Sequence, residues 1–329
     1  MSKKVLILPL KIVISGGLLY VLFRGMEMDV FWKTISSVNY TAVISIFFLL
    51  VGVQTLSTLR WSLILKKDIN VPFMRLLSIY FIGMFFNNFL PTLVGGDVVK
   101  AYYLYRGSRR GGVSLASIFL DRYSGFTALM TITALATYSG YNLIAGTTIP
   151  WLLYTLLAGF VVISLMIWVN LFHGWAVRIL NKIKLFGINN KIDKFYRALM
   201  GYKRDRGILL KIFIISVVVQ GSVIVGYYIL SRGIGMEMPL NYFFIFVPLA
   251  TVVAMLPVSL AGLGIREGAF VFLFAKAGVT SAEALSISLL FFFITVVVSL
   301  IGGVEYIRLG SVRVGEIETK DMEVVGSKQ

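Results

Sequence analysis

Two segments of this chain interrupt long apolar runs with nearly the same order of residues. Each has a Leu–Pro pair, a short apolar spacer, a glycine cluster and then charged residues that open a second apolar run; the segments are residues 90–97 and 256–267. Proline removes a backbone donor and glycine weakens a helix, so both segments free polar backbone groups that lipid cannot satisfy. Such breaks persist at membrane depth only where they are buried in protein or line a polar cavity. Paired breaks at matching positions of two halves are typical of a transport site.

The composition places these breaks in a membrane protein. The chain has 329 residues, of which 58% are hydrophobic and 14% charged, and a mean hydropathy of +0.88. A soluble domain of that composition would lack the polar side chains to cover its surface. Several runs of about 20 apolar residues match the thickness of a bilayer. The predicted fold class is therefore an all-α polytopic membrane protein.

The same composition excludes several kinds of chemistry. With no cysteine, the chain has no disulfide, no thiolate nucleophile and no cysteine-ligated metal. The single histidine, His173, excludes the usual multi-histidine zinc site, and we expect neither a metal nor a cofactor. The net charge is +16 and the sequence pI is about 9.9, but the basic residues follow a membrane topology. We therefore expect no nucleic-acid partner.

The apolar runs predict about six ordinary spans and two broken elements. The spans are expected at an N-terminal run that ends near residue 23 and at 40–65, 113–138, 151–170, 208–230 and 284–307, and the broken elements at 73–106 and 240–278. Residues 1–307 are expected to form one transmembrane domain, whose halves, 1–170 and 207–307, are joined by a basic cytoplasmic loop at 171–206. Residues 308–329 are expected to form a polar cytoplasmic tail.

The basic loops predict the orientation of the spans. Lysine and arginine gather around the first broken element and in the loop at 171–206, whereas residues 141–150 carry no charge. Because cytoplasmic loops accumulate these residues, both termini are expected in the cytoplasm of a cell-membrane protein. The two broken elements then enter the bilayer from opposite faces, as in an inverted repeat; whether each is a re-entrant hairpin or a full span with a return stays open. The cations around the first element are Arg60, Lys66, Lys67, Arg75, Arg106, Arg109 and Arg110.

The five tryptophans fall near the predicted span ends or just beyond them. That placement is typical of rings that anchor a protein at the membrane interface. They are Trp32, Trp61, Trp151, Trp168 and Trp175.

Two adjacent charges lie inside a predicted span. Asp121 and Arg122 fall about eight residues into the run that starts at residue 113, roughly 12 Å from its end. Each such ion costs about 2.5–3.5 kcal/mol near the bilayer centre, so the pair needs partners or water. Adjacent helical residues project about 100° apart, so we do not expect these two to neutralise each other. They either pair with charges on neighbouring helices or line the path of a substrate.

Charges also open the helix that follows each break: Asp97 and Lys100 after the first, Arg266 and Glu267 after the second. A helix N-terminus offers unpaired N–H groups and a positive dipole end, which suit a phosphate or a carboxylate. Asp97 and Glu267 are also explained as helix caps. Arg266 adds a cation to an end that is already positive, so we expect it to face an anion, either a carboxylate of the protein or a lipid phosphate.

The residues around the breaks resemble a known family, the flippase-like, lysylphosphatidylglycerol-synthase transmembrane-domain proteins, also called the UPF0104 group. Lys100 and Ala261 depart from the family pattern, in which arginine and glycine are common at these positions. Lysine binds phosphate only as a point charge. The motifs that carry the resemblance are Asn87, Asn88, Phe89, Leu90 and Pro91 with Gly95, Gly96 and Asp97, then Asp121 and Arg122, then Leu256 and Pro257 with Gly262, Gly264, Arg266 and Glu267.

The resemblance implies lipid translocation. In the full-length synthases, a similar membrane unit flips aminoacylated phosphatidylglycerol that a soluble domain makes. We expect that domain to be missing here, because only about twenty polar residues follow residue 307. The expected activity is therefore that of a transporter rather than that of an enzyme.

The sequence thus predicts a flippase or transporter that moves a phosphate-bearing, anionic or aminoacylated lipid head group between leaflets. The substrate would be a membrane phospholipid or a polyprenyl-phosphate lipid, guided through one hydrated pocket where the two breaks meet. Two alternatives stay open: a lipid-modifying enzyme of the lysyltransferase or glycosyltransferase type, and a non-catalytic partner that presents lipid to a separate synthase. The loop at 171–206 is expected to bind anionic head groups, and a homo-oligomer is also left open. The predicted substrate-path residues are Arg266, Glu267, Asp97, Lys100, Asp121, Arg122, Asn87 and Asn88.

Overall fold

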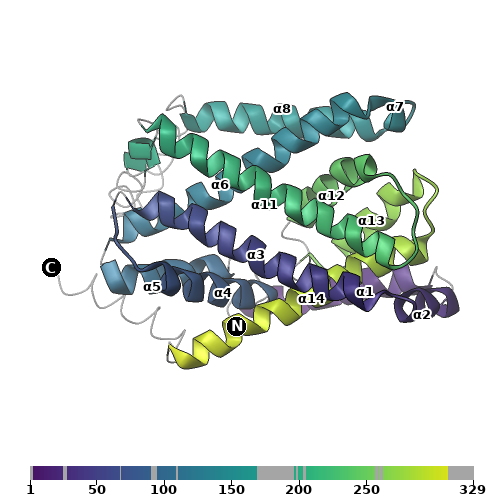
Figure 1. The fold of residues 1–329 in the computed structure, drawn as a ribbon, viewed down its shortest axis with the longest axis horizontal. Coiled ribbons are helices and arrows are strands. Elements are labelled where there is room, and N and C mark those ends of the chain that lie inside the picture. The colour runs from purple at the N-terminus through teal and green to yellow at the C-terminus, as the bar shows by residue number, and fades with distance from the viewer. Residues whose placement is uncertain are drawn as a thin grey trace.

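The computed structural model describes residues 3–24, 28–66, 68–89, 95–108, 110–168, 196–197, 199–202, 205–255, 259 and 262–309, with side chains from residue 13 onward. Within these ranges the regular elements are helices, which confirms the predicted all-α class (Figure 1). The prolines of both breaks, Pro91 and Pro257, lie outside the described residues, as do most of the loop at 171–206 and nearly all of the tail.

The helices follow one another in the order that the apolar runs predict. Up to the first break they are α1 (Lys3–Arg24), α2 (Met28–Ser36), α3 (Tyr40–Leu65) and α4 (Phe73–Phe89). Between the first break and the basic loop lie α5 (Gly95–Ser108), α6 (Gly111–Ser139), α7 (Tyr141–Ile144) and α8 (Ile149–Trp168). The second half holds α11 (Arg206–Gly233), α12 (Leu240–Ala254), α13 (Ile265–Ala275) and α14 (Ser281–Arg308).

Polar side chains fix where three of the long helices begin. Asn39 accepts a hydrogen bond from the backbone N–H of Thr41 at the start of α3, and Asp205 accepts one at the start of α11. Thr280 and Glu283 form a reciprocal capping box at the start of α14. Each cap satisfies N–H groups that the first helical turn leaves without partners.

Four helices are both long and apolar enough to cross a bilayer: α3, α8, α11 and α14. They confirm four of the six predicted spans. The helix α6 is 29 residues long but is less apolar, because it carries Asp121, Arg122 and many serines and threonines. The part of α1 with described side chains, Val13–Arg24, is apolar but short.

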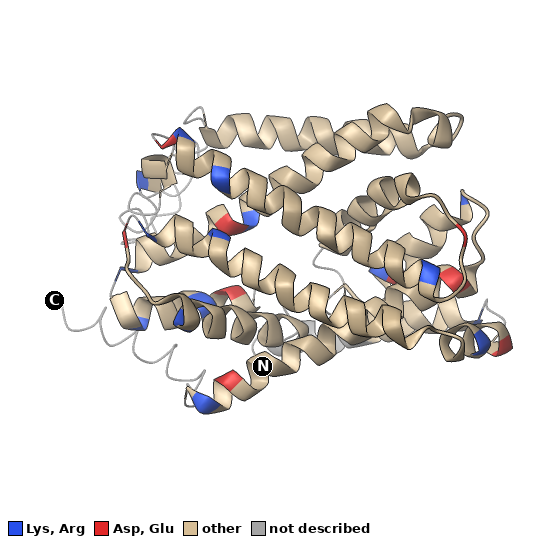
Figure 2. Ribbon diagram, viewed as in Figure 1, with Lys and Arg blue, Asp and Glu red and all other residues tan. Residues whose placement is uncertain are grey.

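Basic side chains gather at one end of the bundle, where α3 ends and α6 and α11 begin (Figure 2). We call it the basic end and define it by Lys66, Arg75, Arg106, Arg110 and Arg206. The opposite end carries both signs of charge, among them Asp29, Lys33, Arg232, Glu237, Lys276 and Glu283. The two ends of the bundle therefore differ in charge, as the ends of a membrane protein usually do.

Two helical hairpins enter the bundle from opposite ends. The helix α4 starts at the basic end and runs inward, and α5 returns beside it to the same end; α12 and α13 do the same from the opposite end (Figure 1). At 1.5 Å per residue the 17 residues of α4 extend roughly 25 Å, less than a full membrane span. The broken elements are thus re-entrant hairpins, with the opposed directions that an inverted repeat requires.

The packing of the two halves follows one repeated pattern. The helices α3 to α6 take the places in the first half that α11 to α14 take in the second. Two pairs of contacts correspond in this way. The contact of α4 with α14 matches that of α12 with α6, and the contact of α3 with α14 matches that of α11 with α6. Matching helices have similar lengths: 26 and 28 residues for α3 and α11, and 29 and 28 for α6 and α14. The two halves therefore interlock instead of forming separate bodies.

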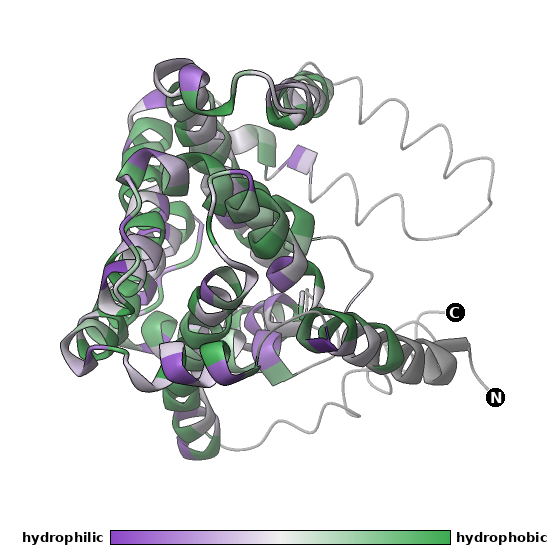
Figure 3. Ribbon diagram, turned by 90° about the vertical axis from the view of Figure 1, so that its right-hand side faces the viewer, coloured by the Kyte–Doolittle hydropathy of each residue, from purple (hydrophilic) through white to green (hydrophobic). Residues whose placement is uncertain are grey.

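Both hairpins contribute to one apolar core. Phe81 and Met84 of α4 belong to the same buried cluster as Phe246 of α12 and Phe270 and Phe274 of α13. In the view along the bundle, hydrophobic residues, drawn green, recur along all of the long helices (Figure 3). The helix α8 packs only lightly on α6 and α7, and 6% of its most apolar window is buried inside the protein. This outer apolar surface is what a lipid environment would cover.

Glycines let α4 approach both of its neighbours backbone to backbone. A Cβ atom at Gly96 of α5 would lie 1.8 Å from the carbonyl oxygen of Gly83 on α4. A Cβ atom at Gly302 of α14 would lie 2.0 Å from the carbonyl oxygen of Phe81. No side chain fits at such distances, so α4 is held rigidly between α5 and α14.

Replacing Gly302 tests this close approach. Gly302→Ala should force α4 and α14 apart and destabilise the fold by about 1–3 kcal/mol, the usual cost of overpacking. Thermal unfolding of the purified protein in detergent would show this as a lower Tm. Gly52→Ala is the matched control, because a Cβ atom there meets nothing within 4 Å. Equal Tm values for the two variants would contradict the packing described.

Candidate functional site

Five charged side chains from α3, α5 and α6 form one chain in which the sign of the charge alternates. The Arg60 guanidinium lies 2.8 Å from Asp121. The Lys100 ammonium lies 3.9 Å from Asp121 and 3.1 Å from Asp97. The Arg122 guanidinium donates to both oxygens of Asp97, at 2.8 and 3.1 Å. The order is Arg60, Asp121, Lys100, Asp97 and Arg122, and we call this set the ion chain.

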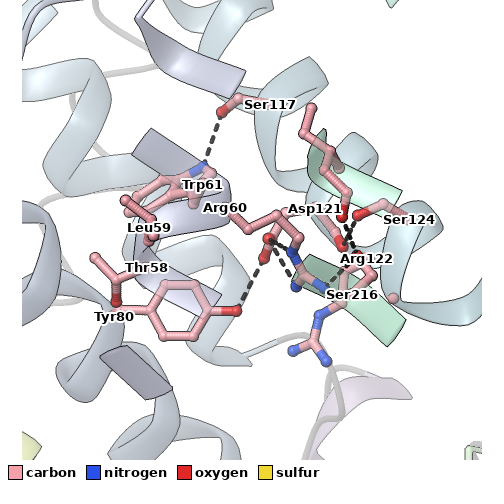
Figure 4. A network of polar contacts seen from close by, with 12 residues as sticks. Thr58, Leu59, Arg60, Trp61, Tyr80, Ser117, Asp121, Arg122, Ser124 and Ser216 are labelled. Carbon is pink, nitrogen blue, oxygen red and sulfur yellow. Dashed lines mark hydrogen bonds and ion pairs between the residues drawn. The ribbon is translucent and has the colours of Figure 1, made fainter. Parts of the chain in front are cut away.

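The first link of the ion chain is buried and fully engaged (Figure 4). Arg60 is 5% exposed and also donates to the hydroxyl of Ser216 on α11, at 2.9 Å. Tyr80 of α4 donates to the second oxygen of Asp121, at 3.0 Å. The prediction that Arg60 belongs to the loop cations is therefore wrong. Its place inside the apolar run of α3 requires an anionic partner, and Asp121 provides one.

Lys100 lies at the centre of the ion chain, between two aromatic rings. Its ammonium is 4.3 Å from the centroid of the Tyr80 ring and 5.5 Å from that of Trp61. Trp61 is fully buried and donates to Ser117, so the prediction that this tryptophan anchors at the interface is wrong. The rings and both carboxylates together stabilise a lysine that is 3% exposed.

Arg122 ends the ion chain and is its only half-exposed member, since 50% of its side chain is accessible. Figure 4 shows that it lies outside the contacts that Asp121 makes, as expected for adjacent residues on a helix. Within the described part of the chain, its Nη1 group has no hydrogen-bond partner. Three cations and two carboxylates leave the ion chain with one surplus positive charge.

The end of α4, just before the first break, carries two asparagines with different roles. The side-chain oxygen of Asn87 accepts a hydrogen bond from the N–H of Gly96, at 2.9 Å, and so caps α5. The neighbouring amide nitrogen of Asn88 is buried without a partner among the described residues. At the described end of α4 one buried amide donor is thus left over, and such a donor favours an acceptor such as the oxygen of an anion.

The second break carries a smaller, electrically neutral cluster. Glu267 is fully buried; one carboxylate oxygen accepts from the backbone N–H of Gly264, at 2.7 Å, and the other pairs with Arg266 and Ser288. The Arg266 guanidinium also lies 4.6 Å from the Phe292 ring centroid. Arg266 thus faces a carboxylate of the protein. Whether it also meets a lipid phosphate stays a prediction.

Glycine is required where this second hairpin turns. Gly262 and Gly264 have φ angles of 80° and 84°, which residues with a side chain rarely adopt. A Cβ atom at Gly264 would also lie 2.7 Å from Leu18 of α1. The helix α1 therefore packs directly on the start of α13.

Corresponding positions of the two halves differ in chemistry. Asp121 lies ten residues after the first residue of α6, Gly111, and Phe291 lies ten residues after the first residue of α14, Ser281. Arg60 lies five residues before Leu65, the last residue of α3. Tyr227 lies six residues before Gly233, the last residue of α11. The ion pair of the first half is matched by stacked rings of Tyr227 and Phe291, whose centroids are 3.8 Å apart. Among the residues that the structure describes, the first half alone combines its hairpin with buried ions on the flanking helices.

The structure brings together only some of the predicted site residues. Asp97, Lys100, Asp121 and Arg122 meet in the ion chain, with Asn87 and Asn88 at the same hairpin, whereas Arg266 and Glu267 form their own cluster. Sequence reasoning missed four partners: Arg60, Tyr80, Ser216 and Ser288. A signal existed only for Arg60, an arginine more than one turn inside an apolar run. In the part of the chain that the structure describes, no three His, Cys, Asp or Glu residues group as metal ligands.

Comparison with known proteins places the whole membrane region in one family. A family model described as the lysylphosphatidylglycerol synthase TM region matches residues 9–303. Two UPF0104 membrane proteins of Methanothermobacter thermautotrophicus are 25% and 27% identical; the matches cover 69% and 68% of this chain and 73% and 70% of those proteins. A UPF0104 membrane protein of Pyrococcus horikoshii is 24% identical over 70% of this chain and 76% of its own length.

A double-mutant cycle at the Arg60–Asp121 pair tests the ion chain. Either Arg60→Ala or Asp121→Ala alone leaves an uncompensated buried charge and should cost about 3–5 kcal/mol. The double variant should lose clearly less than the sum of the two, as measured by thermal unfolding in detergent. Arg308→Ala, which removes an exposed pair with Glu305, is the control and should cost at most about 1 kcal/mol. Strict additivity at Arg60 and Asp121 would contradict their pairing.

Proposed function

Because this chain belongs to the lysylphosphatidylglycerol synthase TM-region family, also called UPF0104, we propose that it moves phosphate-bearing lipid head groups between the leaflets of the cell membrane. It is a membrane protein with long apolar helices. On this proposal the protein acts as a flippase or transporter, with an anionic or aminoacylated phospholipid or a polyprenyl-phosphate lipid as substrate.

The observation that carries the proposal is the surplus of positive charge and donors at the first hairpin. A surplus ion inside a bilayer is costly unless an anion or water accompanies it. A lipid phosphate would supply one negative charge and oxygen acceptors for the Nη1 of Arg122 and the amide of Asn88, neither of which has a partner among the described residues. Arginine binds phosphate oxygens through parallel N–H groups, which gives both affinity and orientation.

The opposed hairpins support movement across the bilayer rather than binding on one side. One hairpin opens toward each end of the bundle, and both belong to the same core. In transporters built from inverted repeats, the discontinuous helices hold the substrate near the midplane and the two sides open alternately. We infer the same use of the hairpins here.

The charge of the basic end indicates which side of the membrane each end of the bundle faces in this proposal. Cytoplasmic ends of membrane proteins are enriched in lysine and arginine. The basic end, with the end of α14, would then face the cytoplasm, and both chain termini would lie on that side. The carboxylates that an enzyme would use as acid or base, Asp97, Asp121 and Glu267, are each engaged with a cation, which favours transport over catalysis.

Reconstitution into vesicles tests the proposal. Vesicles of phosphatidylcholine that hold the full chain and a trace of head-group-labelled phosphatidylglycerol should move the label between leaflets, as measured by chemical quenching from outside. Arg122→Ala should slow this movement about 10- to 100-fold, the value of one charge-assisted hydrogen-bonding contact. Arg122→Lys should recover part of the rate.

The matched control is Arg308→Ala, since Arg308 is also an ion-paired arginine on a long helix but lies at its exposed end. Its rate should equal that of the wild type. Equal rates for wild type, Arg122→Ala and protein-free vesicles, with every labelled phospholipid and polyprenyl-phosphate lipid tried, would overturn the proposal.

A further inference from the structure

A hollow of about 130 Å³ opens at the basic end between the α3–α4 loop and the last turns of α5. That volume holds about four water molecules, or a phosphate with a small substituent. Several lining residues, among them Pro72, Arg75 and Gly107, are exposed, so the hollow reaches the surface. We call it the access hollow; its lining is Ile69, Asn70, Val71, Pro72, Arg75, Ile79, Tyr103, Leu104 and Gly107.

The chemistry of the lining combines a cation with apolar walls. Arg75 and the amide of Asn70 are polar, whereas Ile69, Val71 and Leu104 are hydrophobic. A free inorganic ion would gain little from the apolar walls. A phospholipid presents a phosphate next to glycerol and acyl carbons, so its chemistry matches both parts of the lining.

The wall formed by the α3–α4 loop is fixed in place. Tyr202 donates a hydrogen bond to the carboxylate of Asp68, at 3.1 Å, and Arg110 donates to the backbone carbonyl of Asp68, at 2.8 Å. Burial and the neighbouring carboxylate raise the pKa of Tyr202 far above its usual range, so the phenol keeps its proton and the bond persists at physiological pH. The access hollow is therefore preformed.

The access hollow lies close to the ion chain: one helical turn from Lys100 along α5, and next to Tyr80, a partner of Asp121, on α4. Ile79, which lines it, precedes Tyr80, the donor to Asp121. Leu104 lies four residues after Lys100 on α5, which corresponds to about 6 Å along the helix. For a head group in the hollow, the next cation further into the membrane would be Lys100, one helical turn away along α5.

From this placement we propose that the access hollow is a binding site for the phosphate of an anionic phospholipid, with Arg75 as its first contact. It takes the head group from the leaflet at the basic end before the head group reaches Arg122. The second statement rests on the proposed function, whereas binding in the hollow does not depend on it.

Binding to the full chain in detergent tests the site, with short-chain phosphatidylglycerol as the probe and phosphatidylcholine and inorganic phosphate as comparisons. Wild type should bind phosphatidylglycerol more tightly than either comparison. Arg75→Gln should weaken this binding at least fivefold, and Val71→Trp, which fills the hollow but keeps the charge, should weaken it as well. Arg206→Ala is the control: an exposed arginine at the same end, outside the lining. Unchanged binding in both hollow variants, or equal binding of inorganic phosphate, would overturn the proposal.

Transport kinetics separate this site from the ion chain. In the vesicle assay, Arg75→Gln should raise the lipid fraction that gives half-maximal rate at least fivefold and leave the maximal rate unchanged. Arg122→Ala should lower the maximal rate. A fall in the maximal rate alone for Arg75→Gln would contradict a role in access. Wild type that binds phosphatidylglycerol in the hollow but moves no lipid would overturn the proposed function and leave the binding site standing.

Discussion

A charge inside hydrocarbon must be paired, and this constraint organises the first half of the molecule. Asp121 and Arg122 lie on α6 and each takes a different partner: Asp121 takes Arg60 of α3, and Arg122 takes Asp97 of α5. Lys100 joins the two pairs. Because breaking any buried pair leaves an uncompensated ion, the polar contacts hold α3, α5 and α6 in one register. The re-entrant hairpin is thus positioned by electrostatics on one side and by glycine contacts with α14 on the other.

The interlocked repeat explains how a chain of this size keeps two interrupted helices inside a membrane. The helices of each hairpin pack against helices from both halves, as interrupted helices in a membrane require. Side chains accept hydrogen bonds from backbone N–H groups next to both breaks. Asn87 accepts from Gly96 at the start of α5, and Glu267 accepts from Gly264 just before α13. The paired helices of the two hairpins thus repeat the same packing with different polar residues.

The sequence predicted the class, the order of the helices and the opposed hairpins, because apolar length and Pro–Gly punctuation are local signals. The ends of α3 and the start of α4 fall where the apolar runs placed them. Partners across helices were less accessible, since periodicity does not tell which neighbour a helix face meets. Arg60 and Trp61 therefore looked like interface residues, although both are buried against α6. The adjacent pairs show the same limit: Asp121 and Arg122 turn apart, whereas Arg266 and Glu267, at a helix start, pair with each other.

The difference between ions in one half and stacked rings in the other has an electrical consequence. If the two halves carried the same charges and exchanged conformations, the charge movements would cancel. The membrane potential would then not change the relative free energy of the two conformations. Among the described residues, buried surplus charge is confined to the first half. If the protein alternates between two conformations as proposed, an exchange that displaces this half along the membrane normal shifts that charge through the transmembrane field. A full crossing is worth about 2.3 kcal/mol per 100 mV. The resting potential of the cell would then favour one of the two conformations, in proportion to the fraction of the field that the ion chain traverses.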